Sequence, residues 1–191
     1  MKLTIMQEKI LNSAESLIQR MGYNAFSYKD IALIVGIKTS SIHYYYPTKE
    51  DLAVAVIDWQ LERVLLVLNE LKSNQALTLQ AKLLHVVDVI LSLTLHDEMK
   101  MCLGGILASD VLSLPEKLKK KVRHFFDAIE KWIKELLDIE HYKNDAVDAL
   151  YSRDNLPKYL LIQIEGGLLL SRLYHDFAYI EIVKQFIKKI G

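Results

Sequence analysis

Hydroxyl, aromatic and basic side chains are crowded together between positions 36 and 52, more densely than in any other segment of the chain. The segment reads Gly-Ile-Lys-Thr-Ser-Ser-Ile-His-Tyr-Tyr-Tyr-Pro-Thr-Lys-Glu-Asp-Leu. Hydroxyl and aromatic groups near the start of a short helix can contact base edges and thymine methyls in the major groove of DNA. A lysine one element later, Lys49, can contact a phosphate. The segment therefore predicts a DNA-contacting head.

Short helices are needed to present this segment, and capping signals mark where they begin. A hydroxyl residue followed three positions later by an accepting side chain forms such a cap, and glycine commonly ends a helix. Gly36 supplies the tight turn before the third helix, and three helices joined in this way predict a helix-turn-helix. The expected helices are 4–21, capped by Thr4 with Gln7 and ended by Gly22; 27–35, capped by Ser27 with Asp30; and 39–45, in which Ile42 and one of Tyr45 and Tyr46 turn inward.

The rest of the chain also predicts helices, and no strand pattern competes with them. Thr48 with Asp51 caps a long fourth helix that ends near a loop at 73–75. Further helices are expected at about 78–95, 99–112, 115–138, 157–174 and 177–189, whereas residues 139–154 give no clear pattern. We therefore predict an all-α protein of about nine helices, with a three-helix domain at 1–48 followed by a helical bundle at 49–191.

Composition limits the class of protein. The chain has 191 residues, of which 51% are hydrophobic, with zero formal net charge. A lone cysteine, Cys102, excludes a disulfide framework within the chain and fits a reducing compartment. Neither a signal-peptide pattern nor an apolar stretch of about 20 residues is visible. We expect a soluble, cytoplasmic protein without a membrane partner.

The order of these parts resembles the TetR family of bacterial transcriptional repressors. The likeness is most specific at residues 22–52 and covers the tail in helix order alone. It implies a homodimeric regulator, a repressor, that binds a palindromic double-stranded DNA operator and is released by a small effector. The matching positions are Gly22-Tyr23, Ser27, Ile31-Ala32, Gly36-Ile37, Ser41-Ile42, Tyr46 and Lys49-Glu50-Asp51-Leu52.

Ten residues of the head are candidates for contact with bases or phosphates. Three positions depart from the family pattern: Lys38 replaces a small polar cap, Ser40 stands where glycine is common, and His43 replaces a common tyrosine. An ordinary capped surface helix is the alternative interpretation, and a helical adaptor without specific DNA binding is the alternative function. The candidates are Ser27, Tyr28, Lys38, Thr39, Ser40, Ser41, His43, Tyr44, Tyr45 and Lys49.

The tail offers candidates for an effector cavity. Apolar walls with a few polar groups suit a small apolar ligand, although the same spacing also fits a plain core. Cys102 is either a small buried residue or a thiol that senses electrophiles, with Lys100 close in sequence. The candidates are Trp59, His96, Met99, Cys102, Leu103, Phe126, Tyr159 and Gln163.

The segment 156–174 is apolar on more than one face, which requires a packing partner on each side. One side can pack on its own domain, and the other predicts a two-fold interface with a second subunit, together with the final helix. The alternative is the central helix of a monomer. The expected interface residues are Leu160, Ile164, Gly166, Gly167, Leu170, Tyr174 and Phe177.

Enzyme signatures are not found in the sequence. The six histidines are scattered, the glycine pairs lie inside helical patterns, and no Gly-x-Ser-x-Gly motif occurs. We expect no enzymatic activity, no cofactor and no metal. The basic run at 117–123 is expected to be a solvated helix face without a nucleic-acid role.

Overall fold

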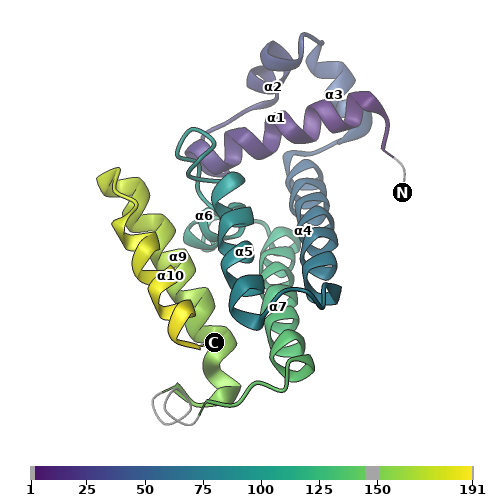
Figure 1. The fold of residues 1–191 in the computed structure, drawn as a ribbon. Coiled ribbons are helices and arrows are strands. Elements are labelled where there is room, and N and C mark those ends of the chain that lie inside the picture. The colour runs from purple at the N-terminus through teal and green to yellow at the C-terminus, as the bar shows by residue number, and fades with distance from the viewer. Residues whose placement is uncertain (1–2, 145–150, 191) are drawn as a thin grey trace. The chain divides into compact units, whose positions relative to one another are not determined.

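A computed structural model describes residues 3–144 and 151–190, and these ranges contain nine α-helices and no strand (Figure 1). The all-α prediction is confirmed. No helix in this part of the chain is long and apolar enough to cross a membrane. The helices are α1 (Ile5–Met21), α2 (Tyr28–Val35), α3 (Thr39–Tyr45), α4 (Lys49–Ser73), α5 (Leu79–Ser92), α6 (Leu103–Ser109), α7 (Glu116–Ile139), α9 (Leu156–Tyr174) and α10 (Ala178–Ile190), with a 3₁₀ turn at Arg153–Asn155.

The chain divides into two compact units that do not follow the sequence in order. The first unit comprises Met1–Arg63 and Leu103–Phe125, and the second comprises Val64–Cys102 and Phe126–Gly191. Helices α4 and α7 therefore contribute residues to both units, and α6 belongs to the unit that holds the head. The predicted boundary at residues 48 and 49 does not coincide with this division, and as a boundary between functions it stays a prediction.

The caps of the head form where the sequence places them. The Gln7 backbone N–H donates to Thr4 Oγ1 at 3.2 Å, and the Ser27 N–H donates to Asp30 Oδ2 at 2.7 Å. Helix α3 begins at Thr39 as expected. Glycines end α1 and α2 with positive φ angles of 84° at Gly22 and 75° at Gly36, a conformation that other residues adopt with strain. Ile42 of α3 and Tyr46, which directly follows α3, turn inward and are buried.

The predicted helix at 99–112 is shorter than expected, because the chain turns before it. Glu98 and Met99 both have positive φ angles, 56° and 57°, which a continuous helix does not allow. The Lys100 N–H instead donates to the Thr94 carbonyl at 3.1 Å. Apolar spacing alone did not reveal this turn. The segment 145–150, part of the pattern-free stretch, lies outside the described residues.

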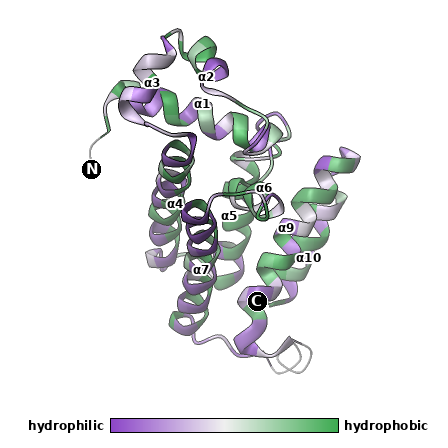
Figure 2. Ribbon diagram, turned by 180° about the vertical axis from the view of Figure 1, so that it is seen from behind, coloured by the Kyte–Doolittle hydropathy of each residue, from purple (hydrophilic) through white to green (hydrophobic). Residues whose placement is uncertain are grey.

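Helices α9 and α10 pack side by side in the second unit, and hydrophobic residues recur along both (Figures 1 and 2). Gly167 faces α10: a Cβ there would lie 3.1 Å from Ile180 Cδ1 and 3.1 Å from Val183 Cγ2. Gly166 is open, with no atom within 4 Å of a Cβ. The two neighbouring glycines therefore serve different faces of α9.

Candidate nucleic-acid interface

Helix α3 presents the outward face of the head. Tyr44 is 81% exposed, and its ring meets the edge of Tyr45 at a centroid distance of 5.1 Å. The remaining polar candidates of this segment differ in exposure, because successive residues of a helix point in different directions. Of these, Lys38, Ser40 and His43 are exposed, whereas Thr39, Ser41 and Tyr45 are half-buried. Seven of the ten candidates thus occupy one short segment with its polar atoms at or near the surface.

The side chain of Tyr28, a candidate for contact with DNA, is buried inside the head. Its hydroxyl lies 2.8 Å from the Tyr46 carbonyl and 2.6 Å from the Thr48 carbonyl, and donates into this pair of acceptors. Burial is the main cause that raises the pKa of Tyr28 above its ordinary value. The side chain therefore ties α2 to the turn between α3 and α4, and only its backbone amide remains as a candidate contact.

His43 is oriented by two neighbours. Its Nδ1 lies 3.1 Å from the Pro47 carbonyl, and its ring centroid lies 4.6 Å from that of Tyr28. Because a carbonyl oxygen can only accept, the hydrogen bond requires the proton on Nδ1. The exposed Nε2 is then left for a contact outside the protein.

Lys49 also turns inward. Its Nζ donates to the Phe26 carbonyl and lies 4.2 Å from the Phe26 ring centroid and 4.9 Å from that of Tyr23. Burial lowers its pKa, and the nearby Asp30 carboxylate opposes that change. The ammonium would have to leave this aromatic pair to contact a phosphate, so its resident role is to hold the segment before α2.

The carboxylate of Asp30, in the first turn of α2, caps the start of this helix. Asp30 Oδ2 accepts from the Ser27 N–H and hydroxyl, both at 2.7 Å, and these bonds lower the Asp30 pKa. The Ser27 amide is therefore already engaged. A phosphate at this helix start would also meet the negative charge of Asp30, which weakens the attraction expected from the helix end.

The basic run of α7 is not simply solvated. Lys117 Nζ lies 3.1 Å from Asp51 Oδ1, and Lys121 Nζ lies 2.7 Å from Asp58 Oδ2, so two lysines one turn apart reach two acids on α4. The Thr48 hydroxyl, and then Lys117, lower the pKa of Asp51. Lys117 and Lys121 lie on one face of α7, and Asp51 and Asp58 lie on one face of α4, but the sequence alone does not pair these two faces.

The candidate effector residues are divided between the two compact units. Trp59 lies under the Arg63 guanidinium at 3.7 Å, in a cluster where Arg63 and Gln60 donate to the buried Glu15. Trp59 and Leu103 belong to the first unit, and the other six belong to the second. His96 is exposed with its ring 5.5 Å from Phe177, Tyr159 packs on Tyr151 at 4.8 Å, and Met99 and Phe126 are half-buried. The effector cavity stays a prediction.

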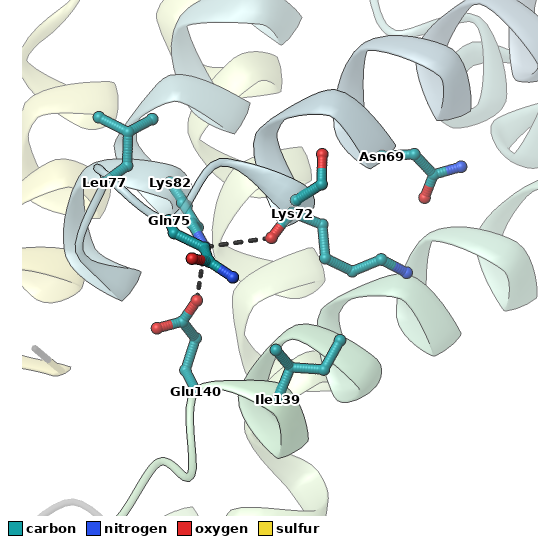
Figure 3. A pocket seen from close by; sticks show the side chains of 8 residues that line it. Asn69, Lys72, Gln75, Leu77, Lys82, Ile139 and Glu140 are labelled. Carbon is teal, nitrogen blue, oxygen red and sulfur yellow. Dashed lines mark hydrogen bonds and ion pairs between the residues drawn. The ribbon is translucent and has the colours of Figure 1, made fainter.

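One recess of the second unit, of about 520 Å³, contains none of these candidates (Figure 3). Its central feature is Lys82, whose side chain is 2% exposed. Lys82 Nζ donates to the Lys72 carbonyl at 3.1 Å and to Glu140 Oε1 at 2.5 Å. The ammonium thereby satisfies a carbonyl in the last turn of α4, where backbone carbonyls lack helical partners, and pairs with the Glu140 carboxylate directly after α7. These contacts describe a structural staple of three helices.

A second recess, of about 450 Å³, follows the groove between α9 and α10. It is lined by Gln163, Gly166 and Leu170 from α9 and by Tyr179 and Ile182 from α10, among others. Gln163, predicted to contact an effector, therefore faces this groove.

The outward face of α9 differs in part from the predicted dimer surface. Leu160, Ile164 and Gly167 are buried within their own unit, so the prediction placed them on the wrong side of the helix. Gly166 is open on the outward side. The exposed apolar residues of this face are Ile162, Leu169, Leu170, Leu173, Tyr174, Phe177 and Ile182.

The residues that the structure describes contain no group of three His, Cys, Asp or Glu side chains able to hold a metal ion. What they do contain is an all-helical fold with a capped helix-turn-helix whose third helix is exposed, the arrangement found in many DNA-binding regulators.

Comparison with known proteins gives the family. Residues 10–56 match the family model of bacterial regulatory proteins, tetR family. The chain is 30% identical to the HTH-type transcriptional regulator in the lacX 3′ region of Lactococcus lactis subsp. lactis, over 97% of this chain and 94% of that protein. A TetR transcriptional regulator from Legionella pneumophila is 44% identical, with a TM-score of 0.89 over 99% of this chain and 98% of that one. A TetR-family regulator from Agrobacterium tumefaciens is 25% identical, with a TM-score of 0.84 over 97% of each chain.

The chain therefore belongs to the TetR family of transcriptional regulators. Members of this family bind DNA and dimerise.

Proposed function

We propose that the protein is a homodimeric repressor that reads a palindromic operator with α3 and is released by a small effector or by modification of Cys102. The exposed face of α3 supports the first part, because Tyr44 and Ser40 project from a head whose caps are closed. Tyrosine and hydroxyl groups in the major groove contact thymine methyls and base edges. Lys38, exposed at the start of α3, is placed to contact a phosphate.

Selection from random duplexes with the full-length protein tests DNA reading, and a palindrome is the expected product. Tyr44→Ala should then weaken binding to that duplex by about 1–3 kcal/mol per head, the usual cost of losing a base contact. Leu33→Ala is the matched control, since Leu33 is 84% exposed on α2 of the same head against 81% for Tyr44. Equal affinities for both variants and the wild type would refute the assignment of α3.

Lys38→Ala addresses the phosphate contact separately. The loss of one phosphate contact should weaken binding to all sequences alike and should reduce the slope of log affinity against log salt by about 1. A helical adaptor that has lost specific DNA binding is the alternative, and failure of the wild type to enrich any duplex would favour it.

Dimerisation through α9 and α10 would set the spacing of the two heads. Two reading helices must lie about 34–36 Å apart to enter successive major grooves. The row of exposed leucine, isoleucine and aromatic side chains on α9 and α10 supports this surface, since large exposed apolar patches on soluble proteins commonly mark interaction sites. The opening at Gly166 gives a partner helix room for close approach.

Release through Cys102 is supported by its surroundings. Cys102 directly precedes α6, is half-buried, and forms a hydrogen bond with the Glu165 side chain. Burial raises the pKa of Glu165, and the bond from Cys102 opposes that change. An α,β-unsaturated carbonyl compound would add to the thiol: a sulfur–carbon bond forms, the carbon–carbon π bond breaks, and the thiol proton ends on the adjacent carbon.

Two measurements separate the thiol mechanism from a bound effector. Cys102→Ser should abolish release of DNA by such an electrophile while basal affinity is retained. Mass spectrometry of the wild type should show one adduct at Cys102. If the serine variant still releases DNA on exposure, the thiol mechanism is wrong and a reversible effector is favoured. A coupling of about 1–3 kcal/mol between sites suffices for useful derepression.

A further inference from the structure

The turn after α6 contacts the loop after α1, although 87 residues separate them. Asp110 Oδ2 accepts from the Tyr23 N–H at 3.3 Å, and Asn24 Nδ2 donates to Ser113 Oγ at 2.8 Å. We call these two contacts the loop latch. All four residues belong to the first compact unit.

Gly22 shows how closely the two segments approach. A Cβ at this position would lie 2.8 Å from Asp110 Oδ2, closer than real Cβ contacts allow. Its φ of 84° independently favours glycine. Two separate constraints therefore favour glycine at the end of α1: the positive φ angle and the close approach of the turn after α6.

The turn that carries Asp110 is itself fixed. The Ser113 N–H donates to the Asp110 carbonyl at 2.8 Å, and the Ser113 hydroxyl donates to the same oxygen at 2.9 Å. Two bonds to the Asp110 carbonyl fix the backbone from which its side chain extends, so less conformational entropy is lost when the carboxylate accepts from the loop. The acceptor is preorganised for the Tyr23 amide.

The loop at 22–26 matters because it joins α1 to the two helices that carry the DNA-reading face. Lys49 holds this loop from α4, through the Phe26 carbonyl and the Tyr23 and Phe26 rings. Asp110 holds it at the Tyr23 backbone. The loop is thus fixed at two points by segments that both lie outside it in sequence, and its position determines where α2 begins.

We propose that Asp110 is a positioning residue for DNA binding, which fixes the loop before α2 and so populates the orientation of α2 and α3 that fits the operator. The proposal rests on the function proposed above and assigns a part in it to a residue outside the matched family region, 10–56. A carboxylate is repelled by phosphate, so Asp110 acts through the loop and makes no contact with DNA. Its loss lowers the fraction of heads ready to bind, and affinity falls by that fraction.

The test compares Asp110→Ala, Asp110→Asn and the control Asp127→Ala, an exposed aspartate of α7 outside the loop latch. The probe is the duplex selected by the wild type. Asp110→Ala should lose about fivefold in affinity per head, and so about 25-fold for two heads, the equivalent of one ordinary hydrogen bond in each. Asp110→Asn keeps an accepting oxygen and should stay within about threefold of the wild type. The control should bind as the wild type does.

Two further readouts separate positioning from a phosphate contact and from lost folding. The salt slope of Asp110→Ala should equal that of the wild type, whereas a lost phosphate contact would lower it by about 1. Amide exchange of Tyr23, measured by NMR without DNA, should accelerate in Asp110→Ala but not in Asp110→Asn. This measurement stays informative if the wild type binds no duplex, so failure of the proposed function and failure of the loop latch are distinguishable.

A double-mutant cycle with Gly22→Ala completes the test. The positive φ penalises alanine in both backgrounds, but the close contact exists only where Asp110 is present. Gly22→Ala should therefore reduce affinity less in the Asp110→Ala background than in the wild type. Equal reductions, or unchanged Tyr23 exchange in Asp110→Ala, or wild-type affinity of that variant, would overturn the proposal.

Discussion

Replacing Leu173 with glutamate should separate the subunits, whereas the same change at Leu66 should not. The two leucines are matched, since each is 65% exposed. Leu173 lies on the outward face of α9, and Leu66 lies on α4. If α9 and α10 form the interface, contact with a second subunit covers Leu173 and leaves Leu66 in solvent.

The expected cost follows from the surface that Leu173 exposes. Full burial of a leucine side chain stabilises by about 1.5–3 kcal/mol, so covering the exposed 65% contributes about 1–2 kcal/mol. A two-fold axis brings in two copies, which gives about 2–4 kcal/mol per dimer. A glutamate buried there adds the cost of removing a charge from water. The dissociation constant of the dimer should therefore rise by about 30-fold to 1,000-fold from the loss of apolar burial alone. The buried glutamate should raise it further.

Sedimentation velocity over a range of protein concentrations measures this directly, because one chain has a mass of 22.0 kDa. Leu173→Glu should shift to the single-chain mass at concentrations where the wild type and Leu66→Glu remain dimers. Circular dichroism should show equal helix content for all three. If Leu173→Glu and Leu66→Glu dissociate alike, or neither does, the α9 and α10 face is not the interface.

Three other predictions concern stability and are read from urea unfolding. Gly167→Ala should be less stable than Gly166→Ala, because only the former adds a Cβ 3.1 Å from side chains of α10; equal stabilities would contradict the facing assigned to the two glycines. Lys82→Met should cost about 3 kcal/mol, because it leaves Glu140 and a helix-end carbonyl without the ammonium; a loss below about 1 kcal/mol would refute the staple. Asp51 has a lowered pKa, so its stabilising contribution is complete above its unfolded pKa of about 4 and is lost as the pH falls through its lower folded pKa. Asp51→Asn should therefore have a lower free energy of unfolding than the wild type at pH 7, and the difference should disappear as the pH falls below about 4. A difference that does not change with pH would contradict a stabilising role of the ionised carboxylate.

Local signals in the sequence predicted the head well because its determinants are local. The cap at Thr4 and the glycine turn at Gly36 each depend on neighbours within four residues, and both formed as expected. The inward contacts of Tyr28 and Lys49 could not be predicted for the opposite reason. Their side chains bond to carbonyls 18 to 23 residues away, and a position at a helix start does not reveal such a long-range contact.

Helix α9 shows a different limit. Apolar residues occur all round it, so periodicity identifies the helix but cannot say which stripe packs on α10. The prediction selected Leu160 and Ile164 for the partner surface, yet these residues are buried in their own unit, while Ile162 and Leu173 are exposed. The few polar residues of the helix, among them Lys158, Gln163 and Glu165, are too widely spread around it to mark the boundary between the faces. Only the position of α10 resolves the ambiguity, and that position depends on tertiary packing.

Helix α6 offers a short covalent connection between the two features proposed to control DNA binding. Cys102 directly precedes this seven-residue helix, and Asp110 directly follows it. At 1.5 Å per residue, α6 is about 10 Å long, and a helix of two turns transmits a shift of its first residue to its last with little bending. An adduct on Cys102 must displace the thiol from Glu165, so the start of α6 is expected to move with it.

Adduct formation should therefore accelerate amide exchange at Tyr23 in the wild type, because the loop latch loosens when Asp110 moves. In Asp110→Ala the amide of Tyr23 already exchanges fast, so the adduct should change its exchange rate little. The electrophile should also release a smaller fraction of the bound DNA from this variant than from the wild type. Cys102→Ser supplies the unreacted control in both backgrounds. If the adduct releases DNA to the same extent with and without Asp110, the signal reaches the head by another route, and the more direct candidate is α4, which runs from Lys49 beside the reading head into the second unit.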